Sequence, residues 1–326
     1  MKRREFITIL GAAATWPLAV GAQQPAMPVI GFLSARAPGD APELLAAFRQ
    51  GLEDSGFVEG QNVAIEYRFA ENQNERLPAL AADLVYRQVT VIAATTTPAA
   101  LAAKAATTMI PVVFSTAANP IELRLVTSLN LPGGNVTGVT QLNVEIAPKR
   151  VELLHELIPT ATVIALLVNP TFPELAEPIT RASQVAARTI GLELHVIHAS
   201  SEGDFEAVFA KLVQLRAGGL VIGTDVFFTS RQKQLAALTV RQAVPAVYQN
   251  REFVAAGGLM SYGGSNTDTY RLAGDYTARI LKGAKPADLP VQQSTKVELF
   301  LNFKTARSLG ITIPLHLSGR ADGVIE

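Results

Sequence analysis

Small polar side chains follow the short apolar runs of this sequence, at the points where strands would end. In the first half these are hydroxyls and an amide: Ser34, Thr96, Thr97, Ser115, Thr116 and Asn119. In the second half an amide, a carboxylate and aromatic rings take the same places: Asn169, Phe172, Asp225, Phe227 and Tyr248. Backbone N–H groups at helix starts, together with hydroxyls, can hold a carboxylate. Asp225 can pair with an ammonium group, and the rings can flank an apolar group. The pattern predicts a binding site for a small molecule.

The same residue types also have a purely structural use. Ser, Thr, Asn and Asp are the preferred residues at helix N-caps, so each hydroxyl taken alone is more often a cap than a ligand contact. Asp225 is the strongest candidate, because it stands at a predicted strand end beside aromatic residues.

The elements that would position these residues alternate between strand and helix. In the first half, apolar runs predict strands at 29–33, 63–68, 89–94 and 111–114, and amphipathic patterns predict helices at 42–56, 76–87, 98–107 and 121–129. The second half predicts strands at 163–168, 192–197, 220–222 and 245–248, with helices at 150–157, 175–190, 204–215 and 231–242. In each half the third strand begins roughly 60 residues after the first, which indicates two lobes of the same architecture.

The predicted fold is α/β, with two Rossmann-like lobes, each a parallel sheet flanked by helices. The last elements, at 258–309, are too few for a third core and are expected to return to the two lobes. We expect lobe 1 to comprise residues 28–142 and 265–292, and lobe 2 residues 143–264 and 293–326. Several crossings between lobes would form a hinge with a cleft, and the carboxyl ends of the strands would face that cleft.

The first 22 residues are typical of an export signal. Arg3 and Arg4 precede an uncharged apolar run at 6–20, and small residues end at Ala22, so cleavage is predicted before Gln23. The arginine pair favours the twin-arginine route, although general secretion stays open. The chain has no cysteine and therefore no lipid-modified cysteine, so we expect a soluble periplasmic protein and no lipoprotein.

Composition argues against several other classes of protein. Lys and Arg number 28, equal to Asp and Glu, and form no basic block, which disfavours a nucleic-acid partner. The four histidines are scattered, and the chain has no nucleophile elbow, P-loop or dinucleotide fingerprint. We therefore expect no enzyme activity, no metal and no cofactor.

Several motifs are shared with a known family. They are Ala-Phe-Arg-Gln-Gly at 47–51, Gly-Gln-Asn-Val-Ala-Ile-Glu-Tyr at 60–67, Pro-Ala-Ala at 98–100, Pro-Gly-Gly-Asn-Val-Thr-Gly-Val at 132–139, Gly-Gly-Leu at 257–259, Ile-Leu-Lys-Gly-Ala-Lys-Pro-Ala-Asp at 280–288 and Leu-Gly-Ile-Thr-Ile-Pro at 309–314. With these the chain resembles the substrate-binding proteins of ABC transporters, in the group that includes tryptophan-binding and other amino-acid-binding proteins. The resemblance implies a class I periplasmic-binding fold with three crossings.

The resemblance also implies roles for individual residues. It assigns ligand contacts to Ser34, to the helix start at Thr97 and to Asp225. Relatives often have Thr-Asp-Pro after the fourth strand, whereas this chain has Asn119 in place of that aspartate. If the aspartate binds an amino group, its absence argues against an α-amino acid ligand.

We therefore expect the solute-binding component of an ABC importer, a monomer that alternates between open and closed forms. Its partners would be a small-molecule ligand and an inner-membrane ABC permease with its cytoplasmic ATPase. An amino acid or other small carboxylate is favoured, with aromatic compounds among the candidates. The alternatives are a periplasmic sensor that signals to a membrane receptor and, less favoured, a periplasmic enzyme.

Overall fold

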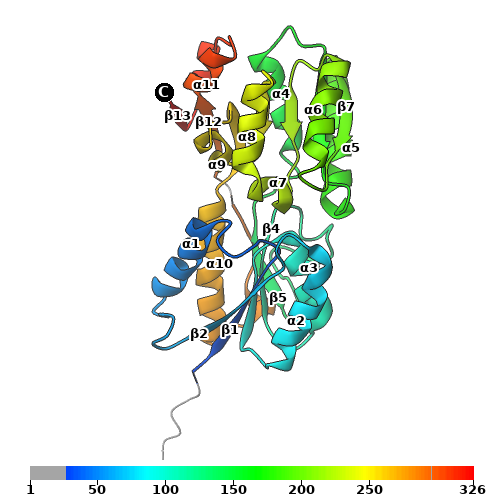
Figure 1. The fold of residues 1–326 in the computed structure, drawn as a ribbon. Coiled ribbons are helices and arrows are strands. Elements are labelled where there is room, and N and C mark those ends of the chain that lie inside the picture. The colour runs from blue at the N-terminus through cyan, green and yellow to red at the C-terminus, as the bar shows by residue number, and fades with distance from the viewer. Residues whose placement is uncertain (1–26, 295) are drawn as a thin grey trace, which may run out of the picture.

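The computed structural model describes residues 27–294 and 296–326, which form two α/β lobes stacked end to end (Figure 1). The predicted export signal, with Arg3, Arg4 and Ala22, lies outside the described residues. Each lobe has its own sheet, one of six strands and one of seven. None of the helices in the described ranges combines the length and apolar character that crossing a membrane requires.

Lobe 1 is built on an all-parallel sheet with the order β11-β5-β4-β3-β1-β2. Its strands are β1 (Val29–Ser34), β2 (Ala64–Phe69), β3 (Val91–Ala94), β4 (Val112–Thr116), β5 (Val136–Thr140) and β11 (Gln292–Gln293). Its helices are α1 (Pro42–Glu53), α2 (Leu77–Tyr86), α3 (Thr97–Ala106) and α10 (Asn266–Leu281), with 3₁₀ turns η1 (Asn74–Arg76) and η2 (Pro286–Asp288). Because helices cover both faces of the sheet, its central strands β1, β3 and β4 are apolar up to their carboxyl ends.

Helices α1 and α10 pack very closely on one face of this sheet. A Cβ atom on Gly51 would lie 1.9 Å from the carbonyl oxygen of Arg271, and one on Gly274 would lie 2.2 Å from that of Phe48. Only glycine allows the two backbones to approach this far. This contact attaches α10, which is distant in sequence, to lobe 1.

Lobe 2 has the strand order β13-β12-β10-β9-β8-β6-β7, in which β12 is antiparallel to β10. Its strands are β6 (Val163–Val168), β7 (Glu193–His198), β8 (Leu220–Ile222), β9 (Ala246–Tyr248), β10 (Met260–Gly264), β12 (Val297–Asn302) and β13 (Gly323–Ile325). Its helices are α4 (Ala147–Leu157), α5 (Pro173–Thr189), α6 (Asp204–Leu215), α7 (Val226–Ser230), α8 (Gln232–Arg241), α9 (Arg251–Ala255), α11 (Phe303–Ser308) and α12 (Leu315–Ser318).

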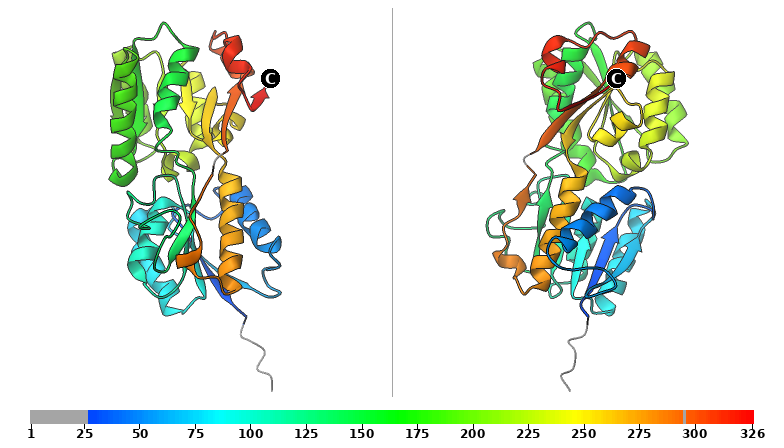
Figure 2. Two further views of the ribbon diagram at one scale, coloured as in Figure 1. Left: turned by 180° about the vertical axis from the view of Figure 1, so that it is seen from behind. Right: turned by 90° about the vertical axis from the view of Figure 1, so that its left-hand side faces the viewer.

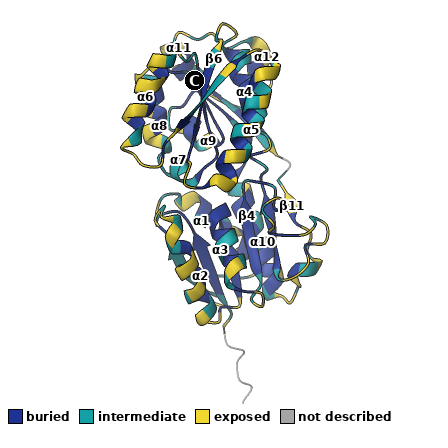
Figure 3. Cartoon of the chain, turned by 90° about the vertical axis from the view of Figure 1, so that its right-hand side faces the viewer, coloured by how far each residue is buried: buried dark blue, intermediate teal, exposed yellow. Residues whose placement is uncertain are grey.

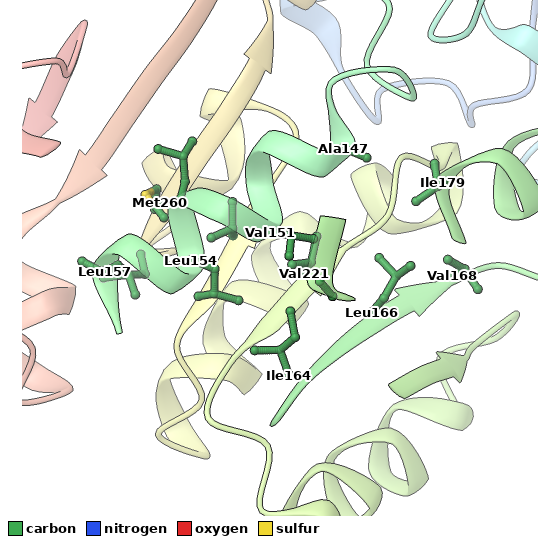
Figure 4. Close-up of a cluster of buried hydrophobic side chains, with 14 of the residues drawn as sticks. Ala147, Val151, Leu154, Leu157, Ile164, Leu166, Val168, Ile179, Val221 and Met260 are labelled. Atoms are coloured by element: carbon green, nitrogen blue, oxygen red, sulfur yellow. The ribbon is translucent and has the colours of Figure 1, made fainter. Parts of the chain in front are cut away.

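Because side chains alternate along its strands, the sheet of lobe 2 has an apolar core layer on each face. Ile164, Leu166 and Val168 of β6 point toward α4 and α5 (Figure 4), whereas Ala165 and Leu167 face the opposite layer. Buried strands and exposed outer helix faces recur in both lobes (Figure 3).

The chain passes between the lobes three times, after β5, after β10 and after β11 (Figure 2). The predicted fold class is therefore confirmed, and the C-terminal elements are divided between the two sheets. The residue numbers that we expect to bound each lobe stay predictions.

Two local predictions were wrong. The segment 121–129, expected as a helix, forms turns in which Arg124 has a φ of +55° and the N–H groups of Leu125 and Val126 both donate to the Pro120 carbonyl. Strand β5 was not expected, because Pro132 and two glycines suggested only a turn before the crossing.

Candidate functional site

A small cavity, with a volume of about 60 Å³, lies between the two lobes at the carboxyl ends of their strands. Fourteen of its eighteen lining residues are polar or charged. Lobe 1 and its crossings contribute Arg36, Thr95, Thr96, Thr97, Ser115, Thr116, Ala117, Gln141, Asn143, Asn266 and Tyr270. Lobe 2 contributes Leu175, Thr224, Asp225, Val226, Thr229, Gln249 and Asn250.

The wall from lobe 1 is a set of hydroxyls at the start of α3. Thr96 is the N-cap residue of that helix, and its Oγ1 accepts a hydrogen bond from Ala35 N at 3.2 Å. Thr97 Oγ1 lies 2.9 Å from Thr116 Oγ1 and accepts from Ala117 N at 3.2 Å. The Thr96 side chain makes no capping bond to α3, so the first N–H groups of the helix remain suited to an anion.

Asp225 provides the negative charge of the wall from lobe 2. It follows β8 as the N-cap of α7, where its Oδ1 accepts from Phe227 N at 2.8 Å and from Asn169 Nδ2 at 3.1 Å. Its side chain is buried, and burial raises its pKa from the ordinary 3.8 to about 6, against the lowering effect of these hydrogen bonds and of the positive charge of Arg36.

Arg36 provides the opposite charge from lobe 1, two residues after β1. The residue is only 9% exposed, and within the described part of the chain its Nε has no hydrogen-bond partner and its guanidinium no carboxylate within 4.0 Å. A buried charge without a partner is costly. Arg36 and Asp225 thus present unlike charges to one cavity from opposite lobes, an arrangement that fits a zwitterion.

Further polar atoms of the lining also lack partners among the described residues. They are Thr224 Oγ1, Gln249 Oε1 and Asn250 Oδ1, all on residues that follow β8 and β9. Buried polar atoms in folded proteins are nearly always hydrogen-bonded. These atoms therefore mark positions for polar ligand atoms or water.

The crossings themselves contribute to the cavity. Gln141 Nε2 donates to Asn266 Oδ1 at 2.8 Å, and Asn143 Nδ2 donates to Gln141 Oε1 at 2.8 Å. Behind them, fully buried Arg150 donates from Nε to Tyr262 O at 2.8 Å and from Nη2 to Asn143 O at 2.9 Å. Burial lowers the pKa of Arg150 to about 9. A ligand in the cavity would thus touch the segments that cross between the lobes.

The structure brings five of the predicted residues together at the cavity: Thr96, Thr97, Ser115, Thr116 and Asp225. Ser34 does not line it, because its Oγ accepts from Arg36 N at 3.3 Å. Asn169 lies behind Asp225, to which it donates. Asn119 faces a separate groove and its Oδ1 accepts from Ile121 N at 3.0 Å, so it stabilises a turn.

The three predicted aromatic residues lie outside the cavity. Phe172 packs in the apolar core of lobe 2. Tyr248 is fully buried in the opposite layer, stacked on Phe253 with ring centroids 4.6 Å apart and its hydroxyl 2.7 Å from Thr239 Oγ1. Phe227 stacks on Phe205 and lines a neighbouring cavity. The strand ends were correct, but these rings face away from the cavity.

The sequence-based predictions did not include Arg36, Gln249 and Asn250, which line the cavity and have buried side-chain atoms without a hydrogen-bond partner among the described residues. Gln249 is adjacent to Tyr248, and because side chains alternate along a strand it faces the cavity where Tyr248 faces the core. Arg36 follows Ser34 by two residues and could have been found as a lone cation at a strand end. Gln141 and Asn266 lie at crossings whose positions the sequence does not mark.

Among the described residues no cluster of three or more His, Asp or Glu side chains could hold a metal ion.

Two comparisons with known sequences both find proteins that bind small molecules. The sequence model of the family described as ABC transporter substrate binding protein matches residues 39–325. A tyrosine-binding protein of Clostridioides difficile (strain R20291) is 26% identical over 263 residues, which are 80% of this chain and 75% of that protein.

Two solved structures bear on the arrangement of the lobes. An ABC domain from Streptococcus pneumonia in complex with L-Trp has a TM-score of 0.83 at 26% identity, covering 91% of this chain and 99% of that one. The ligand-free, open structure of a substrate binding protein with adhesive properties from Clostridium difficile covers the same shares at 23% identity, with a TM-score of 0.66. The overall similarity of this chain is thus greater to the L-Trp complex than to the open structure.

Proposed function

The chain belongs to the ABC transporter substrate binding protein family, and on that premise we propose that it captures an amino acid between its two lobes for an importer. The observation that carries the proposal is the pair Arg36 and Asp225, unlike charges buried on opposite sides of one cavity. An α-amino acid carries a carboxylate and an ammonium group a few bonds apart, which matches this pair. The amino-acid-binding relatives support the same ligand class.

In this proposal the ligand carboxylate binds Arg36 and the N–H groups at the start of α3. The ammonium group binds Asp225. Asn119, which stands where relatives often have an aspartate, lies away from the cavity. The cavity therefore loses no carboxylate through this replacement, and Asp225 supplies the one that the ammonium group needs. The departure in sequence therefore does not oppose an amino acid ligand.

Closure follows from the distribution of these groups. Arg36 belongs to lobe 1 and Asp225 to lobe 2, so a zwitterion makes both ion pairs only when the lobes have come together. A ligand shifts a conformational equilibrium by its difference in affinity for the two states. Without ligand, closure buries two charges that lack close opposite partners and is therefore disfavoured.

Delivery to a membrane permease with a cytoplasmic ATPase, export to the periplasm through the signal at residues 1–22, and a monomeric state complete the proposal. Family membership supports this transport role. The closed form would present both lobes to the permease at once, as one joined surface.

Isothermal titration calorimetry of the purified protein against the proteinogenic amino acids tests the proposal. At least one should bind, and its decarboxylated amine and its deaminated acid should both bind about 100-fold more weakly, since each leaves one buried charge unpaired. Small-angle scattering should show compaction with that ligand. Equal binding of amine, acid and amino acid, or no binding by any amino acid, would contradict the proposal.

A further inference from the structure

The cavity lacks the apolar wall that an aromatic ring needs. Resting on the amino-acid-binding function proposed above, we infer that the preferred ligand is an amino acid with an uncharged hydroxyl- or amide-bearing side chain. This ligand class differs from the tryptophan and tyrosine of the relatives named above.

The first argument comes from a count of hydrogen-bond acceptors. Thr224, Gln249 and Asn250 are 8%, 1% and 5% exposed, and each has a side-chain oxygen without a partner among the described residues. With Asp225 they offer at least four accepting groups on lobe 2. A ligand ammonium group has only three N–H donors. At least one buried oxygen is therefore left over, and a donor on the ligand side chain would satisfy it without an ordered water.

The second argument comes from the apolar part of the lining, which consists of Ala117, Leu175, Val226 and Tyr270. Tyr270 is held by its hydroxyl, which donates to Thr95 O at 2.9 Å, and its ring packs in the core of lobe 1. An aromatic ligand ring would thus press against amides and hydroxyls. It would leave their buried oxygens unpaired, and each such oxygen weakens binding.

The third argument concerns the space next to the cavity. A neighbouring cavity of about 370 Å³ shares Asp225 and Val226 with it. Asn72, Gln73 and Asn169 contribute amides to its wall, so a longer ligand side chain extending in this direction would again meet polar groups.

Calorimetry with pairs of ligands of matched shape tests the inference. Threonine is compared with valine and asparagine with leucine, with tyrosine and tryptophan alongside. We expect threonine or asparagine to bind about 30- to 100-fold more tightly than its apolar partner and than either aromatic amino acid, because the apolar and aromatic side chains leave a buried oxygen of the lining unpaired. Valine, leucine or an aromatic amino acid binding as tightly overturns the inference while the proposed function stands. If no amino acid binds, the proposed function fails and the inference fails with it.

Variants connect the preference to the lining. Gln249→Leu or Asn250→Leu should reduce the preference within the better pair about tenfold by removing an acceptor. Gln214→Leu, on the exposed face of α6, is the matched control and should leave the preference unchanged. Thermal melts establish that each variant is folded. If folded Gln249→Leu and Asn250→Leu both retain the full preference, the inference is wrong.

Discussion

Replacement of Asp225 by asparagine should stabilise the ligand-free closed form and weaken ligand binding. Burial raises the pKa of this carboxyl from 3.8 to about 6, so the folded protein holds the proton more tightly than the unfolded chain. Below pH 3.8 the group is protonated in both states. Between pH 3.8 and about 6 the unfolded chain is ionised while the folded protein still holds the proton, so stability falls as the pH rises across this window, and the full cost above about pH 6 is about 3 kcal/mol.

Asparagine keeps the oxygen that accepts from Phe227 N and Asn169 Nδ2. Its new N–H donors need an acceptor, which offsets about 1 kcal/mol. The free energy of unfolding of Asp225→Asn should therefore exceed that of the wild type by at most about 2 kcal/mol at pH 7.5, the value for a ligand-free protein that is fully closed, and the gain should vanish near about pH 4.5. Urea denaturation at the two pH values measures this difference, with Asp288→Asn at an exposed position as control.

Asp225→Asn should weaken ligand binding although it raises stability. An ammonium group needs the ionised carboxylate, and with a pKa of about 6 only about one Asp225 in ten is ionised at pH 5. Wild-type affinity should thus fall about tenfold between pH 7 and pH 5, whereas Asp225→Asn should bind weakly at both. Destabilisation of the variant at pH 7.5, or wild-type affinity in it, would refute the assignment of Asp225 as a buried ligand contact.

Three further substitutions test other parts of the structure. Arg36→Met should weaken ligand binding about 100-fold in calorimetry without lowering the melting temperature, because it removes the only charged group proposed to bind the ligand carboxylate; unchanged affinity would contradict the role of Arg36. Gly274→Ala should lower the free energy of unfolding by about 2 kcal/mol in urea, since its Cβ would meet Phe48 O at 2.2 Å. Gly203→Ala, whose Cβ has no neighbour nearer than 3.6 Å, is its control and should be neutral. Tyr248→Phe should lose about 1 kcal/mol of stability with its bond to Thr239 but bind ligand normally; a large loss of affinity would place Tyr248 in the site after all.

Much of the fold could be predicted because local signals and tertiary packing agree. The apolar run 163–168 became β6 with the expected bounds, and α6 begins at Asp204 as expected, where the carboxylate accepts the N–H groups of Ser200 and Ser201. The segment 121–129 failed because its backbone amides are used by a turn around Pro120. Strand β5 depends on pairing with β4, a partner that its own sequence does not reveal.

The site was predictable only to the level of strand ends. Thr97 and Asp225 were correctly expected near the cavity, because a Thr or Asp directly after a strand marks the start of a helix, whether it caps that helix or contacts a ligand. The choice between Tyr248 and Gln249 depends on which sheet face meets the cleft, and a shift of one residue reverses it. Gln141 and Asn143 could not be found, because they act through a crossing whose path is set by the packing of two separate lobes.

The clamp formed by Arg150 has a consequence for where the molecule bends. By binding the carbonyl oxygens of both Asn143 and Tyr262, this one side chain ties two of the crossing segments into a single unit at the lobe 2 end. We expect any rotation of the lobes to take place on the other side of the tie, next to Leu142, whose φ of +52° is unusual for a branched side chain. We expect separation of the lobes to let Leu142 return to a negative φ. The backbone strain at this one residue would then contribute to the free-energy difference between the open and closed forms.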